Sequence, residues 1–97
     1  MYCVICKDKP NHVDVRMENR PDHVTYVLAD PSLKTAGPFV AADGETMIGT
    51  LLIVDVASRA EAEAFAANDP YNKAGLFESV EVFAWKHLIG GLADPNA

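Results

Sequence analysis

The order in which two kinds of apolar pattern follow each other constrains the fold of this chain more than any other feature. Four short apolar runs are typical of strands, and two segments carry the apolar spacing of helices. The order is strand 2–7, helix 11–30, strand 33–41, strand 47–56, helix 58–69 and strand 79–87. It predicts an α+β fold of the ferredoxin-like β-α-β-β-α-β type, an antiparallel sheet with both helices on one face.

Local signals mark the ends of several of these elements. Asn11 is the predicted N-cap of the first helix, and Ser58 with Glu61 forms a capping box for the second. The dipeptide Gly37-Pro38 falls within the second predicted strand. Because proline cannot donate to a sheet ladder, this strand is expected at a sheet edge or with a bulge.

The length and the apolar strand faces predict how the chain is organised. A chain of 97 residues is expected to form one domain, assigned here to residues 1–89, with a tail at 90–97. If both helices cover one face of the sheet, the other face presents apolar residues from the segments 2–7, 47–56 and 80–85. Large exposed apolar patches usually mark interfaces. We therefore expect a homodimer with facing sheets, and the sequence leaves open whether dimers assemble further.

Charge and hydropathy exclude several classes of function. The formal net charge of −6 disfavours binding to phosphate backbones. No apolar stretch approaches the roughly 20 residues that span a bilayer. The first residues, MYCVICKDK, lack the basic leader and long apolar run of a signal peptide. We expect a soluble, cytoplasmic protein that binds neither nucleic acid nor membranes.

Cys3 and Cys6 have the C-x-x-C spacing of redox and metal sites, but they lie in a predicted strand. Residues three apart on a strand point to opposite faces, so the two thiols are expected to be buried and reduced. The sequence contains no other metal-ligand spacing and no phosphate-binding glycine loop. We therefore expect neither a metal nor a cofactor.

A stripe of cations on the first predicted helix is the first candidate for a site. Arg16, Arg20 and His23 recur at steps of four and three, which places them on one helical face. They could hold a carboxylate substrate and supply a proton donor or acceptor, or they could form a solvated boundary face. Pro21 lies within this stripe and removes one backbone hydrogen bond. Either the helix kinks there, leaving the carbonyl of Met17 without its usual partner, or the main helix begins at Pro21.

Asp69 and Thr50 are further candidates with two interpretations each. Asp69 precedes Pro70 and is a predicted N-cap of another helical turn, which Gly75 ends. The same carboxylate could orient a histidine and stabilise its charged form. The two roles are compatible, because a cap uses one carboxylate oxygen. Thr50 follows Gly49 in a predicted strand, where it is either a hydrogen-bond donor or an ordinary strand residue.

Five motifs follow one another along the chain: YCVICKDK at the start, RPDH at 20–23, TAGPF at 35–39, IGTLLI at 48–53 and NDPYNKAGLFESVEVFAW at 68–85. In this order and spacing the chain resembles the YciI-like, or YCII-related, family over residues 1–89. The resemblance implies a ferredoxin-like fold, a dimer of the dimeric α+β barrel type, and a pocket with a histidine and an aspartate. These map onto His23 and Asp69. The family often has Gly-Ser where this chain has Gly49-Thr50, so the hydroxyl is kept and the extra methyl narrows the pocket.

The resemblance also implies a small-molecule enzyme, since some relatives are linked to isomerase or dehydrochlorinase-like steps on small unsaturated acids. In this hypothesis His23 transfers a proton, Asp69 orients it, Arg16 or Arg20 holds an acid group, and Thr50 donates a hydrogen bond. The alternatives are a non-catalytic dimeric module that binds or senses a small acidic ligand, and a structural dimer with a vestigial pocket.

Overall fold

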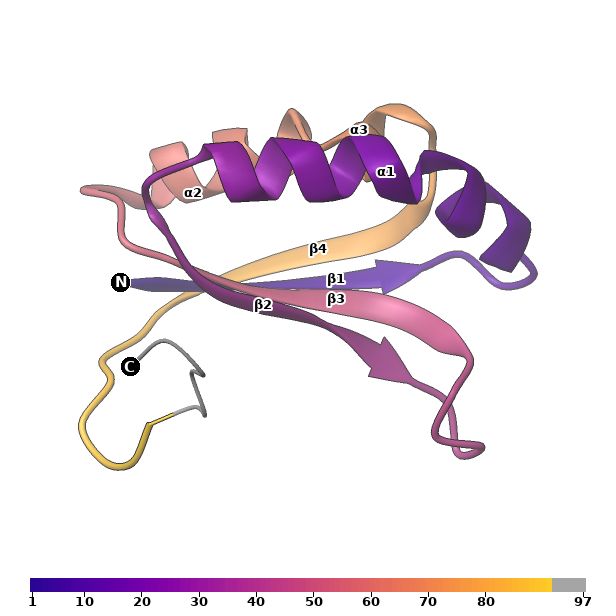
Figure 1. The fold of residues 1–97 in the computed structure, drawn as a ribbon. Coiled ribbons are helices and arrows are strands. Elements are labelled where there is room, and N and C mark those ends of the chain that lie inside the picture. Colours follow the sequence, from indigo (N-terminus) through magenta and orange to yellow (C-terminus); the bar gives the residue numbers. More distant parts are fainter. Residues whose placement is uncertain (92–97) are drawn as a thin grey trace.

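In the computed structural model, which describes residues 1–91, the chain forms one four-stranded sheet and three helices. The elements are β1 (Tyr2–Asp8), α1 (Val13–Ala29), β2 (Leu33–Val40), β3 (Met47–Val54), α2 (Arg59–Ala67), α3 (Pro70–Lys73) and β4 (Phe77–Ala84). The sheet is antiparallel with the order β2-β3-β1-β4. Figure 1 shows all three helices on one face of this sheet. The predicted ferredoxin-like α+β fold is therefore confirmed.

The core lies between the helices and the sheet. Val4 and Cys6 of β1 are fully buried, and they are paired with Leu52 and Thr50 on β3. Alternate residues of a strand point to the same face, so these side chains all face the helices. The helices contribute Phe65 and other buried apolar side chains to the same cluster. Val4 and Cys6 are thus expected to be among the residues least tolerant of substitution.

Helix α1 runs without interruption from Val13 to Ala29 and contains Pro21 in its interior. Figure 1 shows that its ribbon changes direction after the first turns. Pro21 has no N–H to donate to the carbonyl of Met17, so the first of the two interpretations, a kinked helix, agrees with the structure. The predicted N-cap at Asn11 is wrong. Asn11 has a φ of 59°, and the cap position is taken by His12, which makes no side-chain capping hydrogen bond.

The ends of the other elements follow the predicted signals with small differences. The oxygen of Ser58 accepts from the backbone N–H of Glu61 at 3.3 Å, as expected for the start of α2. Strand β2 is at the sheet edge, as Pro38 predicts. The last strand, predicted at 79–87, begins at Phe77 and ends at Ala84. It starts earlier because Phe77 pairs with Asp8 beyond a register shift at the end of β1.

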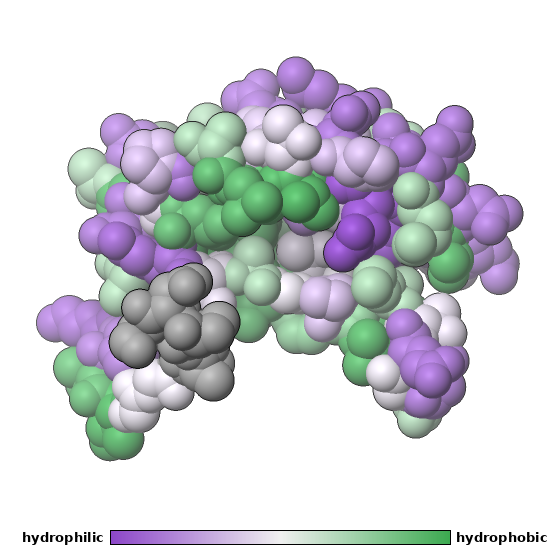
Figure 2. All heavy atoms as spheres, viewed as in Figure 1, coloured by the Kyte–Doolittle hydropathy of each residue, from purple (hydrophilic) through white to green (hydrophobic). Residues whose placement is uncertain are grey.

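The face of the sheet away from the helices is apolar. Cys3 is paired with Ile53 on one side and Phe83 on the other, and Ile5 is paired with Leu51. Phe83 is 50% exposed. Figure 2 shows a recess on this side, between the β2–β3 turn and the segment after β4. Part of the tail predicted at 90–97 lies outside the described residues.

The two cysteines are free and lie on opposite faces, as predicted. Only Cys6 is buried, since Cys3 is on the open face and is half-buried. Gly49 sits where the strands approach closely. A Cβ built there would lie 2.5 Å from the backbone oxygen of Cys6. The glycine is therefore required by the neighbouring strand and not by a ligand.

Candidate functional site

The imidazole of His23 and the carboxylate of Asp69 form a buried pair between α1 and the turn that follows α2. The Nδ1 atom lies 2.9 Å from each carboxylate oxygen. The His23 side chain is 10% exposed and that of Asp69 is fully buried. A carboxylate ion can only accept hydrogen bonds, so Nδ1 carries the hydrogen and Nε2 keeps its lone pair while the ring is neutral.

Asp69 is held in place by the backbone it caps. Its Oδ1 atom accepts from the N–H of Tyr71 at 2.8 Å, and Pro70 takes the first position of α3. One oxygen thus serves the cap and the histidine, and the second serves the histidine alone. The structure thus contains both the predicted cap and a contact of the same carboxylate with a histidine.

Tyr71 packs against the face of the imidazole. The two ring centroids are 3.9 Å apart, and the planes are inclined by only 13°. Tyr71 is 1% exposed, and its ring also meets Phe77 edge to face at 6.1 Å. Nothing in the spacing of the sequence places Tyr71 in contact with His23, so this residue was missed.

Arg16 also contacts Tyr71 and is almost entirely buried. Its Nε donates to Asp8 at 2.7 Å, and its Nη2 donates to Asp8 at 3.2 Å and to the Thr50 hydroxyl at 2.6 Å. The guanidinium carbon is 4.6 Å from the centre of the Tyr71 ring. Arg16 and Thr50 are thus brought together as predicted candidates, but the donors of Arg16 named here already have partners. Asp8, which fixes Arg16, is a second residue that the sequence interpretation missed.

Arg20 differs from Arg16 because it is exposed. Burial raises the pKa of the Tyr71 hydroxyl, and the charges of Arg16 and Arg20 oppose this effect without cancelling it. The interpretation of the stripe as a solvated face fails for Arg16 and His23, both of which are buried, and describes only Arg20.

The Nε2 atom of His23 is within reach of solvent. It makes no hydrogen bond within residues 1–91, whereas every buried side-chain nitrogen and oxygen of that part of the chain has a partner. On the sheet beneath α1, Ala36 and Pro38 face the helices by register but are exposed. Their neighbours Leu52 and Thr50 are buried. The helix layer thus covers this part of β3 and leaves the neighbouring part of β2 exposed.

Figure 2 shows the surface on this side of the molecule. Apolar atoms run along the edge of the helix layer above the sheet, and strongly hydrophilic atoms lie next to them. A site here would offer both an apolar wall and polar groups, the combination common in small-molecule sites.

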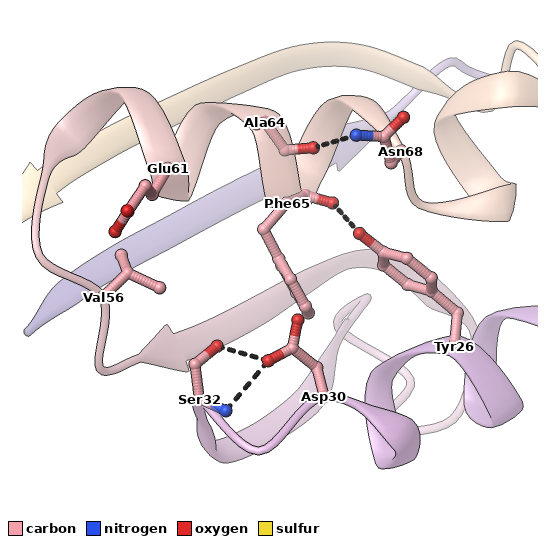
Figure 3. Close-up of a pocket in the computed structure, with 8 residues that line it drawn as sticks. All are labelled: Tyr26, Asp30, Ser32, Val56, Glu61, Ala64, Phe65 and Asn68. Atoms are coloured by element: carbon pink, nitrogen blue, oxygen red, sulfur yellow. Dashed lines mark hydrogen bonds between the residues drawn. The ribbon is translucent and has the colours of Figure 1, made fainter.

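A separate hollow of about 450 Å³ lies between the second half of α1 and α2. In Figure 3 the Tyr26 hydroxyl points to the backbone carbonyl of Phe65, to which it donates at 2.7 Å. The side chains of Asp30, Glu61 and Asn68 are hydrogen-bonded to nearby parts of the chain. These polar groups already join one segment to another, so this hollow is a weaker candidate for a site than the surroundings of His23.

The charges around the site act on the buried thiol of Cys6. Burial raises its pKa most, and the carboxylates of Asp69 and Asp8 raise it further, against the effect of Arg16. The resulting pKa is about 12. Cys6 is therefore a neutral thiol at physiological pH and is not a nucleophile. Within residues 1–91, no cluster of three or more His, Cys, Asp or Glu side chains is arranged to hold a metal ion.

The sequence matches a known protein family along nearly its whole length. The family model described as "YCII-related domain" matches residues 1–86. The chain belongs to the YCII-related family. A YCII-related relative, Protein YciI of Escherichia coli O6:H1, is 33% identical, with 92% of this chain and 99% of the relative covered. An uncharacterized protein of Haemophilus influenzae is 31% identical, with 91% and 98% covered.

Among solved structures, this YCII-related chain is similar to the 5-chloro-2-hydroxyhydroquinone dehydrochlorinase TftG of Burkholderia phenoliruptrix AC1100, in complex with 2,5-dihydroxybenzoquinone. The identity is 35% and the TM-score 0.79, with 90% of this chain and 95% of that chain covered. An antibiotic biosynthesis monooxygenase has a TM-score of 0.57 at 15% identity, covering 92% and 100%. The second likeness shows a shared fold alone. No helix within residues 1–91 has the length and hydropathy to cross a membrane.

Proposed function

We propose that this protein is a cofactor-independent enzyme that transfers a proton on a small unsaturated carboxylic acid or carbonyl compound. The observation that carries the proposal is the state of His23. Its Nδ1–H is held by a buried carboxylate, and its Nε2 is accessible. This arrangement suits a general base, because Asp69 fixes the tautomer and stabilises the imidazolium that forms.

In the proposed reaction, Nε2 removes a proton from a carbon next to the substrate carbonyl, and the electron pair moves to the carbonyl oxygen. Return of the proton to another carbon gives an isomer. Loss of chloride from the adjacent carbon gives an elimination. Similarity to a dehydrochlorinase at 35% identity supports this class of substrate and step. General acid–base catalysis of this kind supplies about 10²–10⁴-fold in rate.

The cations and Thr50 have different proposed parts in substrate binding. We assign the acid group or developing oxyanion to Arg20, which is exposed. Thr50 accepts a hydrogen bond from Arg16 and so retains its own hydroxyl hydrogen for the substrate. A charged donor also strengthens a hydroxyl as a donor in turn. Arg16 thus acts on the substrate through Thr50.

The open face of the sheet supports the further proposal that two copies pair through their sheets. Phe83 and Phe39 are exposed there, beside Ile5 and Leu51. Burying such a face from water is favourable by about 25 cal/mol per Å² of apolar surface. The pairing would leave the helix side, with His23, open to substrate.

The test is a thermal-shift screen with small hydroxyquinones and unsaturated carboxylic acids, followed by turnover assays that detect loss of the conjugated absorbance and release of chloride. His23→Gln is the test variant. His87→Gln is the matched control, since His87 is exposed beyond β4. We expect turnover by wild type and by the control, and a loss of about 10²-fold or more for His23→Gln.

Two other outcomes are informative. A ligand that stabilises wild type and is never converted would indicate the binding or sensing module instead. A ligand that stabilises wild type and His23→Gln equally would remove His23 from the site.

A further inference from the structure

The ring of Tyr71 lies flat against the His23 imidazole and is itself held from several sides. We propose that Tyr71 is a positioning residue, whose ring fixes the plane of the imidazole so that Nε2 keeps one direction. The inference rests on the proposed function in so far as Nε2 is the reacting atom. The structural part of it stands without any substrate.

The hydrogen bonds to Asp69 alone do not fix the imidazole. Nδ1 is 2.9 Å from both carboxylate oxygens, and the ring is otherwise held only by its own Cβ–Cγ bond. Rotation about Cβ–Cγ has a broad energy minimum for histidine, so a hydrogen bond at one ring atom leaves a range of ring angles open. Turning the ring about this bond would swing Nε2 sideways and draw Nδ1 away from Asp69. A flat neighbour at 3.9 Å and 13° blocks that motion, because tilting the imidazole would drive its edge into the Tyr71 ring.

Tyr71 is well suited to this role because its own ring is immobilised. The backbone N–H of Tyr71 donates to Asp69, its ring meets the Phe77 ring edge to face, and the residue is 1% exposed. The Arg16 guanidinium lies over the ring at 4.6 Å. Arg16 is in turn fixed by Asp8 and by Thr50.

The spacing along α1 fits a ring inserted between two side chains. Arg16 and His23 are seven residues apart, which corresponds to two helical turns and about 10 Å along the axis. That is the room needed for an aromatic ring with one planar group on each face. We infer a layered order of guanidinium, phenol ring and imidazole. A lone hydrophobic core residue would need neither the parallel geometry nor the cation.

Two variants separate the ring from the hydroxyl. Tyr71→Phe keeps the flat ring and loses only the hydroxyl. Tyr71→Leu keeps an apolar side chain and loses the flat surface. If the Tyr71 ring positions His23, Tyr71→Phe keeps the imidazole in place and Tyr71→Leu does not. If the hydroxyl were the important group, both variants would lose the positioning to the same extent.

The first readout is NMR of the histidine rings without substrate. We expect the carbon-bound protons of His23 in wild type to be shifted upfield of those of His12 by the current of the stacked ring. His87 is unsuitable as a reference, because its ring lies 5.7 Å from that of Trp85. In the neutral ring, we expect a single Nδ1–H tautomer. Tyr71→Phe should keep both signatures, and Tyr71→Leu should lose the upfield shift and show mixed tautomers.

The wild-type spectrum alone can overturn the proposal, even if Tyr71→Leu fails to fold. Absence of the upfield shift, or a mixture of tautomers in wild type, would contradict it. With a substrate in hand, Tyr71→Leu should lower kcat by about 10²-fold, the cost of a small misplacement, while KM stays within about two-fold. An equal loss in Tyr71→Phe would refute the positioning role, whereas a protein with correct NMR signatures and no turnover would refute only the proposed function.

Discussion

Replacing Arg16 with methionine removes the cation that pairs with Asp8 inside the protein. The side chains of the two residues are 3% and 6% exposed, and Nε is 2.7 Å from the carboxylate. Breaking a buried pair by removing one partner leaves a charge without compensation and costs about 3–5 kcal/mol. A domain of this size has a total stability of about 5–15 kcal/mol. We therefore expect Arg16→Met to lose about a fifth or more of the free energy of unfolding.

The measurement is urea unfolding followed by far-UV circular dichroism at one fixed protein concentration, because assembly of copies would make the midpoint depend on concentration. The matched control is Arg59→Met. Arg59 pairs with Glu63 at a similar 2.9 Å, but these side chains are 59% and 55% exposed. Exposed pairs contribute about 0–1 kcal/mol, so the control should unfold within about 1 kcal/mol of wild type.

The double variant Asp8→Leu with Arg16→Met, together with the two single variants, forms a double-mutant cycle. Removing both charges leaves no uncompensated ion, so most of the lost stability should return, with a coupling of about 2 kcal/mol or more between the two sites. The reasoning is refuted if Arg16→Met costs less than about 1 kcal/mol. It is also refuted if the losses from the two single variants simply add.

Three further changes test other parts of the structure. The folded state keeps the proton of the Cys6 thiol up to its pKa of about 12, whereas the unfolded chain releases it near 8.5. The free energy of unfolding should therefore fall between about pH 9 and 12, by at most about 1.4 kcal/mol per pH unit. Urea titrations across this pH range should show a shallower fall for Cys6→Ala, and equal slopes would contradict the raised pKa. Gly49→Ala should lower the melting temperature and cost about 1–3 kcal/mol, because its Cβ would meet the Cys6 carbonyl oxygen at 2.5 Å; an unchanged melting curve would show that the strands can separate freely. Phe83→Glu, on the open sheet face, should convert a dimer to a monomer in sedimentation velocity, and a dimer that survives this change must pair elsewhere.

Signals carried by neighbouring residues allowed much of the fold to be predicted. Ser58 and Glu61, within four positions, predict the start of α2, and Asp69 with Pro70 predicts the start of α3 in the same way. Such caps depend on local hydrogen bonds, so sequence alone contains them. Asn11 is the exception. Asparagine is a favoured N-cap residue, but the turn before α1 places Asn11 in the left-handed region, and the helix begins at Val13.

The site was predicted only in part because its contacts join distant segments. The approach of His23 to Asp69 spans 46 positions, and the resemblance to a family supplied that pair. The contacts of Tyr71 with His23 and Arg16 depend on how α3 packs against α1, which no periodicity expresses. The partner of Arg16, Asp8, lies at the end of β1, where the strand register decides which face it takes.

Both neighbours of the imidazole, Asp69 and Tyr71, belong to a single short turn, α3 with its cap. Any fluctuation that moves this turn away removes the hydrogen-bond acceptor and the stacked ring at the same time, so His23 keeps both contacts or loses both. Amide hydrogen exchange at Tyr71 would then measure how often the turn opens, independently of any ligand.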